Sequence, residues 1–483
     1  MKKKEEKKRT WKDWVQAVTY CTLLVMFLLW IQAPWWGYLT VPFVFDAYVT
    51  KLVKWSWWKE LENPVTRTIM SWVDAIVFAL VAVYFVNIYF FQNYTIPSSS
   101  LEKSLLIGDY LYVSKTAYGP RAPMTPLSMP LCQHTLPLGG VKSYISWPRW
   151  KYKRISPKPV QLNDIVVFNY PAGDTVALDL RYQSADYHML SYMYGRQIYQ
   201  QNFGEVQLDS ISALERYRLF EQYRALGSSY IKQNPQEFGS VTWRPVDRRE
   251  NYVKRCVGLP GQVLEIKDRI VYLNGVANKE PDNVQYNYQV HTSGRLPDDF
   301  VREIGLSFPD LRDLYQTGVC PLTQKMKEAM EARPDLVDSI AISHPQETDV
   351  LYPLNGHKGW TVDNYGPIWI PAKGASITLN LDNLPVYERC IRVYEGNTLE
   401  VNDQGDILIN GEKATSYTFQ MDYYWMQGDN RHNSADSRYW GFVPEDHVVG
   451  KPVMIWMSRN KDYSLFDGGI RWERLFRWVD NIK

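Results

Sequence analysis

The chain has 483 residues, which is long enough for two or three domains with a large core. Its formal net charge is only +2, so it lacks the basic excess that a nucleic-acid-binding protein would carry, and we expect no nucleic acid as a partner. The five cysteines form no Cys-x-x-Cys pair and the seven histidines show no His-Glu-x-x-His spacing, which argues against a disulfide framework and a metal enzyme; we expect neither a metal nor a cofactor.

The N-terminal region has the composition of a membrane anchor. A cationic segment, residues 1–14, carries seven Lys or Arg, and an uncharged stretch of 32 residues runs from Trp14 to Phe45. One helical crossing needs roughly 20 residues, so this stretch is too long for one crossing and short for two. A cleavable secretory signal is the alternative, but Pro34 directly follows Ala33 and more membrane-like sequence comes after it.

A second uncharged run covers residues 75–91 and would extend about 26 Å as a helix, nearly a full crossing. A buried core helix is the alternative. Cationic residues interleaved with tryptophans separate the two runs, as is typical of a cytoplasmic loop at the headgroups: Lys51, Lys54, Lys59 and Arg67. If both cationic segments are cytoplasmic, the chain crosses three times, which we favour over two, and the part after about residue 91 is extracytoplasmic.

From residue 94 onward the sequence is β-like. Apolar and polar residues alternate over short stretches punctuated by Asn-Gly and Pro-Gly, which predicts antiparallel strands, for example at 109–115, 164–171, 252–261 and 263–275. Segments that begin at Arg255 and Arg389 share Arg-Cys, Leu-Glu and Asn-Gly landmarks. This echo indicates either an internal repeat or two unrelated hairpins that converge on the same turn chemistry.

Two stretches interrupt the β pattern. Residues 174–240 contain a helical patch around 210–226, and residues 296–343 have helical spacing and caps. We interpret them as insertions into a β core, at about 174–240 and 276–384. The predicted organisation is a membrane anchor over 1–92, an extracytoplasmic β catalytic domain over 93–460 and a C-terminal tail over 461–483.

Three serines, residues 98–100, follow the second apolar run closely. A serine hydroxyl is a poor nucleophile until a base takes its proton, and hydrogen-bond donors must face the developing oxyanion. Ser100 and Lys103 form the Ser-x-x-Lys pattern of penicillin-binding proteins and β-lactamases, but no Lys-Thr-Gly element follows. In a strand, moreover, a residue three positions away points to the opposite face.

A second candidate base, Lys254, lies in a predicted strand on the same face as Tyr252 and Cys256. An exposed lysine is protonated at pH 7, whereas burial lowers its pKa by several units, so a base here requires a dry pocket. An ordinary surface lysine is the alternative. The polar segment 428–452 is either a solvated turn or a loop whose Ser434, Asp436 and Arg438 brace an active site.

Four segments together resemble the four successive boxes of bacterial type I signal peptidases, in order and after a membrane anchor: 96–109, 163–171, 252–261 and 428–444. The resemblance implies a mainly antiparallel β-sheet catalytic fold with helical insertions, anchored by N-terminal transmembrane helices. It also implies a serine and lysine dyad that cleaves secretory preproteins after small residues of the Ala-x-Ala type. The implied partners are signal peptides and the lipid bilayer. The implied location is the bacterial inner membrane, and we expect the protein to function as a monomer.

The resemblance also implies a role for each matched residue. Ser100 is the nucleophile, Lys254 is the general base, and the Ser98 hydroxyl joins the Ser100 amide in the oxyanion hole. The supporting residues are Ser434, which orients the lysine, and Arg255, Asp436 and Arg438. The residues that line shallow substrate pockets are Tyr94, Ile96, Leu105, Tyr252 and Val253.

The sequence departs from the family pattern at four positions, where the usual residues are Gly, Met, Pro and an acidic residue: Ser99, Leu101, Lys103 and His432. Lys103 places a second amine near the serine, and we interpret His432 as a surface or hydrogen-bonded residue. A membrane-anchored β protein that binds secreted peptides without cutting them is the alternative function. A self-cleaving repressor with the same dyad fits less well, because nothing here resembles a DNA-binding half.

Overall fold

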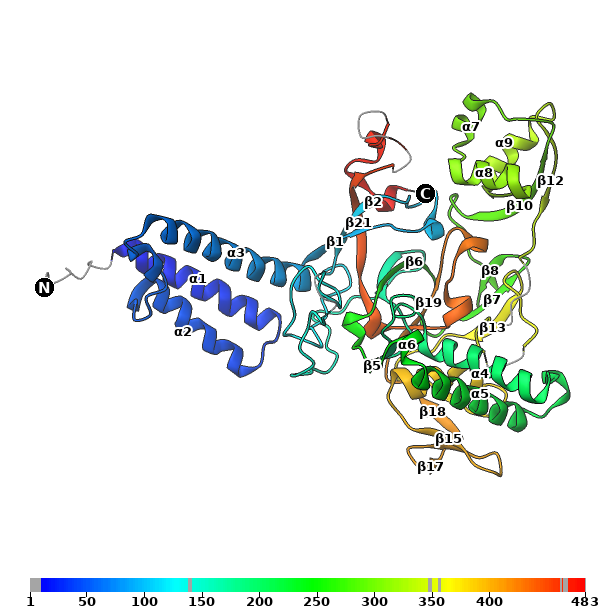
Figure 1. Ribbon diagram of the computed structural model, residues 1–483, viewed down its shortest axis with the longest axis horizontal. Coiled ribbons are helices and arrows are strands. Elements are labelled where there is room, and N and C mark those ends of the chain that lie inside the picture. Colours follow the sequence, from blue (N-terminus) through cyan, green and yellow to red (C-terminus); the bar gives the residue numbers. More distant parts are fainter. Residues whose placement is uncertain are drawn as a thin grey trace, which may run out of the picture. The chain divides into compact units, whose positions relative to one another are not determined.

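The computed structural model describes residues 10–137, 141–345, 350–354, 358–460, 463 and 468–482. It divides into two compact units, of which the first combines the chain up to Phe90 with Gly119–Pro157 and the second combines Phe91–Tyr118 with the chain from Lys158 onward (Figure 1). The cationic residues 1–9 and part of the predicted tail after residue 460 lie outside the described residues. The anchor boundary at residue 92 stays a prediction.

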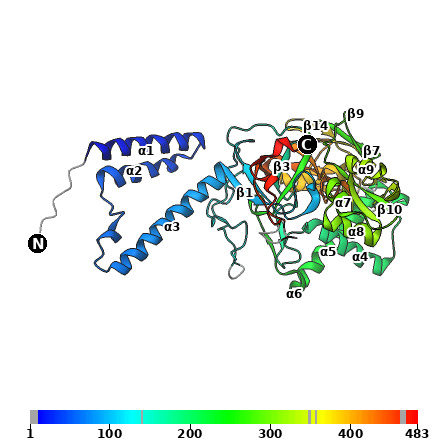
Figure 2. The ribbon, with the colours of Figure 1, turned by 90° about the horizontal axis from the view of Figure 1, so that it is seen from above.

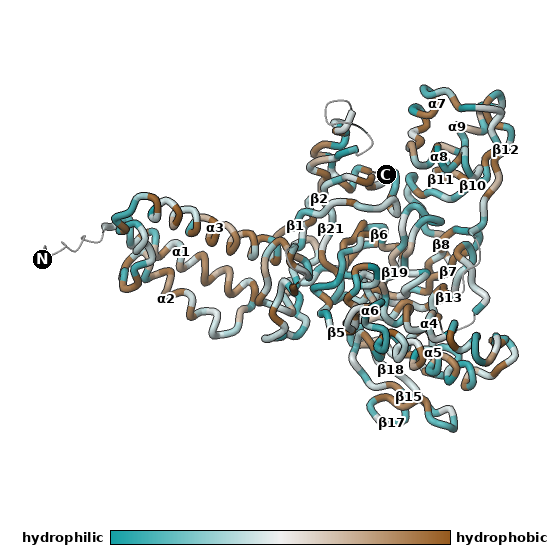
Figure 3. Tube along the Cα trace, viewed as in Figure 1, coloured by the Kyte–Doolittle hydropathy of each residue, from teal (hydrophilic) through white to brown (hydrophobic). Residues whose placement is uncertain are grey.

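Two helices of the first unit, α1 (Trp11–Trp30) and α3 (Pro64–Tyr89), are long and apolar enough to cross a membrane. Thr10 and Asp13 form a capping box at the start of α1, and Asn63 caps α3, whose first residue is Pro64. Only 11% of the most apolar window of α1 and 0% of that of α3 is buried, unlike the core helix of a soluble protein. Figure 3 shows the apolar residues that run along both helices.

Between these helices the chain makes a shorter helical return through η1 (Trp35–Leu39), α2 (Thr40–Phe45) and η2 (Asp46–Thr50). The views in Figures 1 and 2 both show α2 beside α1. The buried Asp46 carboxylate ends the return by accepting hydrogen bonds from the backbone N–H of Leu52 at 2.7 Å and of Val53 at 3.1 Å. Residues 11–50 thus form one long helix and a shorter helical return, while the number of crossings stays a prediction.

The second unit is built on an antiparallel sheet in the order β1-β2-β21-β3-β6-β19-β20, with β22 paired to β21. Its strands are β1 (Phe91–Thr95), β2 (Asp109–Ser114), β3 (Ile165–Asn169), β6 (Asn251–Gly258), β19 (Tyr423–Gln427), β20 (Val443–Pro444), β21 (Val448–Ser458) and β22 (Arg477–Trp478). The predicted class, mainly antiparallel β with helices added, is confirmed.

Strand β3 is buried on both faces, so its alternating side chains belong to two different cores. Val166 packs in one core with Cys256 of β6, whereas Val167 packs in the other with Leu111 of β2. The register pairs Val166 with Lys254, which therefore projects toward the first of these cores. This agrees with the predicted face shared by Lys254 and Cys256.

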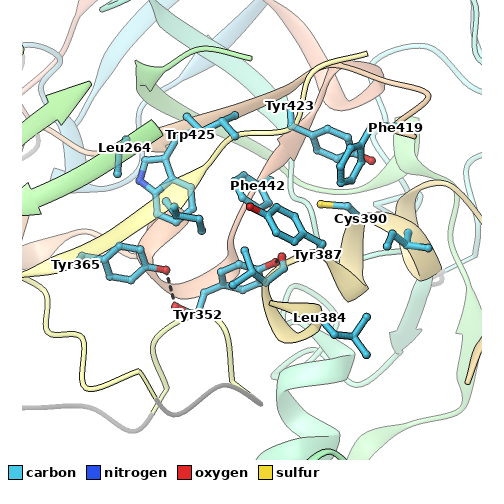
Figure 4. Close-up of a cluster of buried hydrophobic side chains, with 14 of the residues drawn as sticks. Leu264, Tyr352, Tyr365, Leu384, Tyr387, Cys390, Phe419, Tyr423, Trp425 and Phe442 are labelled. Atoms are coloured by element: carbon cyan, nitrogen blue, oxygen red, sulfur yellow. Dashed lines mark hydrogen bonds between the residues drawn. The ribbon is translucent and has the colours of Figure 1, made fainter. Parts of the chain in front are cut away.

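A third core lies under smaller sheets that follow β6 in the chain (Figure 4). Trp425, Tyr387 and Phe442 pack there, and the Tyr365 hydroxyl donates to the Tyr352 carbonyl at 2.5 Å. The sheets are formed by β7 (Val263–Lys267), β8 (Ile270–Leu273), β9 (Val276–Ala277) and β13 (Tyr365–Trp369), by β14 (Ser376–Thr378) with β18 (Ser416–Thr418), and by β15 (Leu399–Val401), β16 (Ile407–Ile409) and β17 (Glu412–Lys413).

The segments that begin at Arg255 and Arg389, which share sequence landmarks, both contain a β-hairpin but differ in the structure before it. The Leu-Glu landmarks lie in the first strands of two hairpins, β7–β8 and β15–β16, and both Asn-Gly landmarks directly follow the second strands. Arg255 and Cys256 lie in β6, whereas Arg389 ends helix α10 (Leu384–Arg389) and Cys390 begins a π-helical turn. The structure therefore favours two hairpins with shared turn chemistry over a repeated unit.

The first insertion is a helical hairpin of α4 (Tyr187–Phe203) and α5 (Ala213–Gln233), followed by α6 (Pro235–Phe238) and flanked by the paired strands β4 (Thr175–Ala177) and β5 (Val241–Trp243). The second is only partly helical. It contains β10 (Gln285–Thr292), α7 (Asp298–Ile304), α8 (Phe308–Thr317), β11 (Val319–Thr323), α9 (Gln324–Glu331) and β12 (Val337–Ile342). The helical spacing predicted over 296–343 missed β11 and β12, because both pair with β10, which lies outside that window.

The close contact between α4 and α5 gives a stability prediction. A Cβ on Gly195 would lie 1.7 Å from the Tyr223 carbonyl oxygen, so Gly195→Ala forces the helices apart. We expect overpacking to cost about 1 to 3 kcal/mol, against a gain of up to about 1 kcal/mol in helix propensity. Thermal unfolding of the purified chain should show a lower midpoint. Gly294→Ala, which meets no atom within 4 Å, is the control, and equal midpoints for both variants would contradict this packing.

Candidate active site

Ser100 lies in a single 3₁₀ turn, η4 (Ser99–Leu101), shortly after β1. The Leu101 carbonyl accepts hydrogen bonds from the N–H groups of Ser104 and Leu105, and both leucines are buried in the core that contains Val167. This apolar anchor fixes the turn and leaves Ser100 only 7% exposed. Ser98 precedes the turn with extended backbone; it is exposed and its side chain caps no helix amide.

The Lys254 amine donates a hydrogen bond of 2.5 Å to the Ser100 hydroxyl, across 154 positions of sequence. Lys254 is 4% exposed. Burial disfavours the ammonium form and lowers the pKa of Lys254 from 10.5 to about 8, although the negative charges of Asp436 and Asp429 oppose the shift. At pH 7 roughly a tenth of such an amine is neutral, compared with well under a thousandth for an exposed lysine.

Lys103, the other amine of this segment, does not contact the serine in the structure. Its backbone has a positive φ of 70°, and its amine donates to the Gly305 carbonyl at 2.7 Å. The expectation that Lys103 places a second amine near the serine stays a prediction, and the structure binds that amine to the Gly305 carbonyl.

Arg255, the residue after the lysine, is held by Asp429. Its guanidinium makes two hydrogen bonds of 2.7 Å to the Asp429 carboxylate, which also accepts from the Ser104 hydroxyl at 2.5 Å. Burial alone would raise the pKa of Asp429, but the Arg255 charge and the hydrogen bonds from Arg255 and Ser104 together hold that pKa below its usual value. Asp429 was not among the predicted site residues, although it lies in the recognised segment 428–444.

The segment 428–438, which we call the active-site loop, packs against the serine turn. Asp436 and Arg438 are buried and paired through hydrogen bonds of 2.9 and 2.8 Å, and Asp436 also accepts from the Gly428 N–H at 3.2 Å. The Asn430 N–H donates to the Ser100 carbonyl at 3.1 Å. The loop is thus joined directly to the turn that carries the serine.

Gly428 leaves no room for a side chain at this junction. A Cβ there would lie 2.3 Å from the Ser434 hydroxyl and 2.5 Å from the Ser100 carbonyl oxygen. Ser434 is therefore close to the serine turn, and its hydroxyl donates to the Ala435 carbonyl at 3.4 Å. The predicted hydrogen bond from Ser434 to Lys254 stays a prediction.

The five predicted pocket residues divide between two cores. Tyr94, Ile96, Leu105 and Val253 gather in one apolar cluster. Tyr252 lies in the other core, where its ring stacks on Tyr170 at 4.7 Å. Among the residues that the structure describes, no cluster of His, Cys, Asp or Glu is placed to hold a metal ion.

Known proteins match much of this chain. A family model described as signal peptidase, peptidase S26, matches residues 69–302 and 370–457. Signal peptidase I of Buchnera aphidicola subsp. Schizaphis graminum is 56% identical over 248 residues, which are 51% of this chain and 61% of the relative. Signal peptidase I of Buchnera aphidicola subsp. Acyrthosiphon pisum is 58% identical over 52 residues, or 11% and 17%. Signal peptidase I of Haemophilus influenzae is 35% identical over 98 residues, or 17% and 28%.

The alignments span less than two thirds of the length of each of these relatives. The family match, in contrast, covers more than half of this chain and omits residues 303–369 between its two parts. It includes Ser100, Lys254 and the whole active-site loop. The chain therefore belongs to the signal peptidase family, peptidase S26.

Proposed function

We propose that this protein is a membrane-bound serine endopeptidase, a type I signal peptidase that removes signal peptides from secretory preproteins after small residues. The observation that carries the proposal is the 2.5 Å hydrogen bond between the buried Lys254 amine and the Ser100 hydroxyl. A serine alone is a weak nucleophile, and an amine with a lowered pKa at this distance is the base that it requires.

In the proposed reaction, Ser100 Oγ attacks the carbonyl carbon of the scissile peptide bond while its proton passes to neutral Lys254 Nζ. The lysine then gives this proton to the departing amine, and an acyl-enzyme remains. A water molecule attacks the ester carbonyl as Lys254 takes its proton, and return of that proton to Ser100 Oγ releases the signal peptide with a new carboxyl end. The amine must be neutral at the start of each half-reaction.

The surroundings of Lys254 support this role. Burial favours the neutral amine, whereas the two nearby carboxylates, Asp429 and Asp436, favour the ammonium. Each carboxylate is paired with an arginine, which limits its effect on the lysine. The resulting pKa of about 8 suits an amine that must both accept and return a proton near neutral pH.

The substrate is proposed to lie extended along the sheet. β1 is an edge strand, so a peptide backbone can pair with it and present alternate side chains to the protein. We propose that small substrate side chains meet the apolar cluster of Tyr94, Ile96, Leu105 and Val253, of which Tyr94 and Val253 are only partly buried. We place the oxyanion between the Ser98 hydroxyl and the Ser100 amide.

The membrane assignment rests on α1 and α3. Only Phe90 separates the end of α3 at Tyr89 from the start of β1 at Phe91, which keeps the serine turn close in sequence to a helix that can cross a bilayer. We place the anchor in the bacterial inner membrane and the catalytic residues on its extracytoplasmic side. Because one chain supplies both Ser100 and Lys254, a monomer suffices.

The dyad is tested by removing each partner separately. Ser100→Ala and Lys254→Met should each lower cleavage of a preprotein by at least about 10³-fold, because nucleophile and base act as a unit. Cleavage is measured with the detergent-solubilised chain by the appearance of mature product. Lys103→Met removes an amine from the same segment and should still cleave. An active Lys254→Met beside an inactive Lys103→Met would move the base to Lys103, and an active Ser100→Ala would exclude serine catalysis.

The lowered pKa of Lys254 predicts a pH profile. Since only the neutral amine accepts the proton, kcat/KM should rise with pH through about 8 and level off above it. The profile is measured between pH 6 and pH 10 on one preprotein, with stability checked at each pH. A rate that rises only near the pKa of an exposed lysine, or that falls between pH 7 and pH 9, would contradict a buried lysine base.

The oxyanion role of Ser98 is tested by Ser98→Ala. Loss of one oxyanion donor typically lowers kcat by about 10² to 10³, and we expect a fall in this range with little change in KM. Ser98→Thr keeps a hydroxyl and should retain more activity. If Ser98→Ala cleaves at the unaltered rate, the oxyanion is bound by other donors.

A further inference from the structure

Residues 303–369, which the family match omits, contact the active-site loop through buried polar groups. The central contact joins His432 of the loop to Asp363. The His432 side chain is 0% exposed, and its Nε2 lies 2.8 Å from Asp363 Oδ1. Its other ring nitrogen, Nδ1, accepts a hydrogen bond from the Asn287 N–H at 3.1 Å. The Nε2 proton therefore points at the carboxylate.

Asp363 is itself fixed to the protein by its backbone and by its burial. Its carbonyl accepts from the Arg269 N–H at 2.9 Å, next to the β7–β8 hairpin, and β13 begins two residues later. Burial would raise the pKa of Asp363, but the hydrogen bonds from His432 and His344 outweigh it and keep this pKa below the usual value. A charged carboxylate in this position holds its buried partner strongly.

Two further contacts join the same segment to the loop. The Tyr352 N–H donates to the Arg438 carbonyl at 2.8 Å, and the Arg438 guanidinium donates to the Val362 carbonyl at 3.4 Å. In the sequence, His432 and Arg438 flank Ser434, whose hydroxyl lies close to the serine turn. A displacement of the loop would therefore move Asn430 and Gly428, which lie against the Ser100 carbonyl oxygen.

We propose that Asp363 is a positioning residue for the dyad: through His432 it fixes the active-site loop, so that the segment 303–369 sets the rate of cleavage without touching the substrate. This inference rests on the proposed function. Asp363 would act on the chemical step rather than on binding, because the loop contacts the backbone of the serine turn at the Ser100 carbonyl. A displacement of about 1 Å at a dyad is enough to lower a rate substantially.

Activity is the first test. Asp363→Ala should lower kcat for preprotein cleavage about tenfold and leave KM within about twofold. His432→Gln keeps a donor at the Nε2 position and should retain most of kcat, whereas His432→Asn lacks that donor and should fall like Asp363→Ala. His344→Ala is the matched control: it removes a 67% exposed partner of the same carboxylate and should not change kcat.

Amide hydrogen exchange is the second test and needs no activity. Asp363→Ala should speed exchange in peptides that cover 428–438 and leave the α4–α5 hairpin unchanged. Unchanged kcat and loop exchange, equal activity of His432→Gln and His432→Asn, or faster exchange over the whole chain would each overturn the proposal. If the unaltered chain cleaves no preprotein, the proposed function fails, and unchanged loop exchange in Asp363→Ala would then overturn the positioning as well.

Discussion

The site depends on an amine that is buried beside a hydroxyl and must lose its charge to act. Removing an ammonium from water is costly, so burial lowers the pKa of Lys254, which the register places on the sheet face that carries Val166 and Cys256. The negative charges of Asp429 and Asp436 oppose this shift of the Lys254 pKa. Their pairing with Arg255 and Arg438 makes the two arginines part of the electrostatics of the lysine, in addition to their structural role.

The topology explains how residues so distant in sequence meet. β6 lies between β3 and β19, so the chain that leaves β19 enters the active-site loop beside the strand that carries Lys254. The same loop then reaches the serine turn through Asn430. Both insertions depart from the ends of strands, so their length does not alter the register that positions Lys254.

Much of the fold and of the candidate site could be predicted from sequence, because these features depend on residues that are close together in the chain. Alternation predicted the strands and the face of Lys254, and the recognised segments predicted the meeting of Ser100 with Lys254. Asp429 was missed because its partner, Arg255, is 174 positions away in the sequence. The two residues meet because β19, which leads into the loop, pairs with β6. His432 could be described only as exposed or hydrogen-bonded, since Asp363 is 69 positions away and no spacing rule connects them. Strands β11 and β12 were missed for a similar reason, because short strands are defined by their partner.

Contacts between the segment 303–369 and the active-site loop differ in kind from those that hold the sheet together. Residues 288–340 have an apolar core of their own, built around residues such as Leu322 and Met330. The segment 303–369 meets the loop through the hydrogen bonds of Tyr352, Val362 and Asp363. Apolar surfaces can slide over one another at small cost, whereas a shift of His432 would leave the buried Asp363 carboxylate without its hydrogen-bond donor. A carboxylate placed against His432 therefore fixes position more sharply than the same area of apolar contact would. The segment 303–369 adds no strand to the eight-stranded sheet, yet through this contact it can determine the position of the active-site loop.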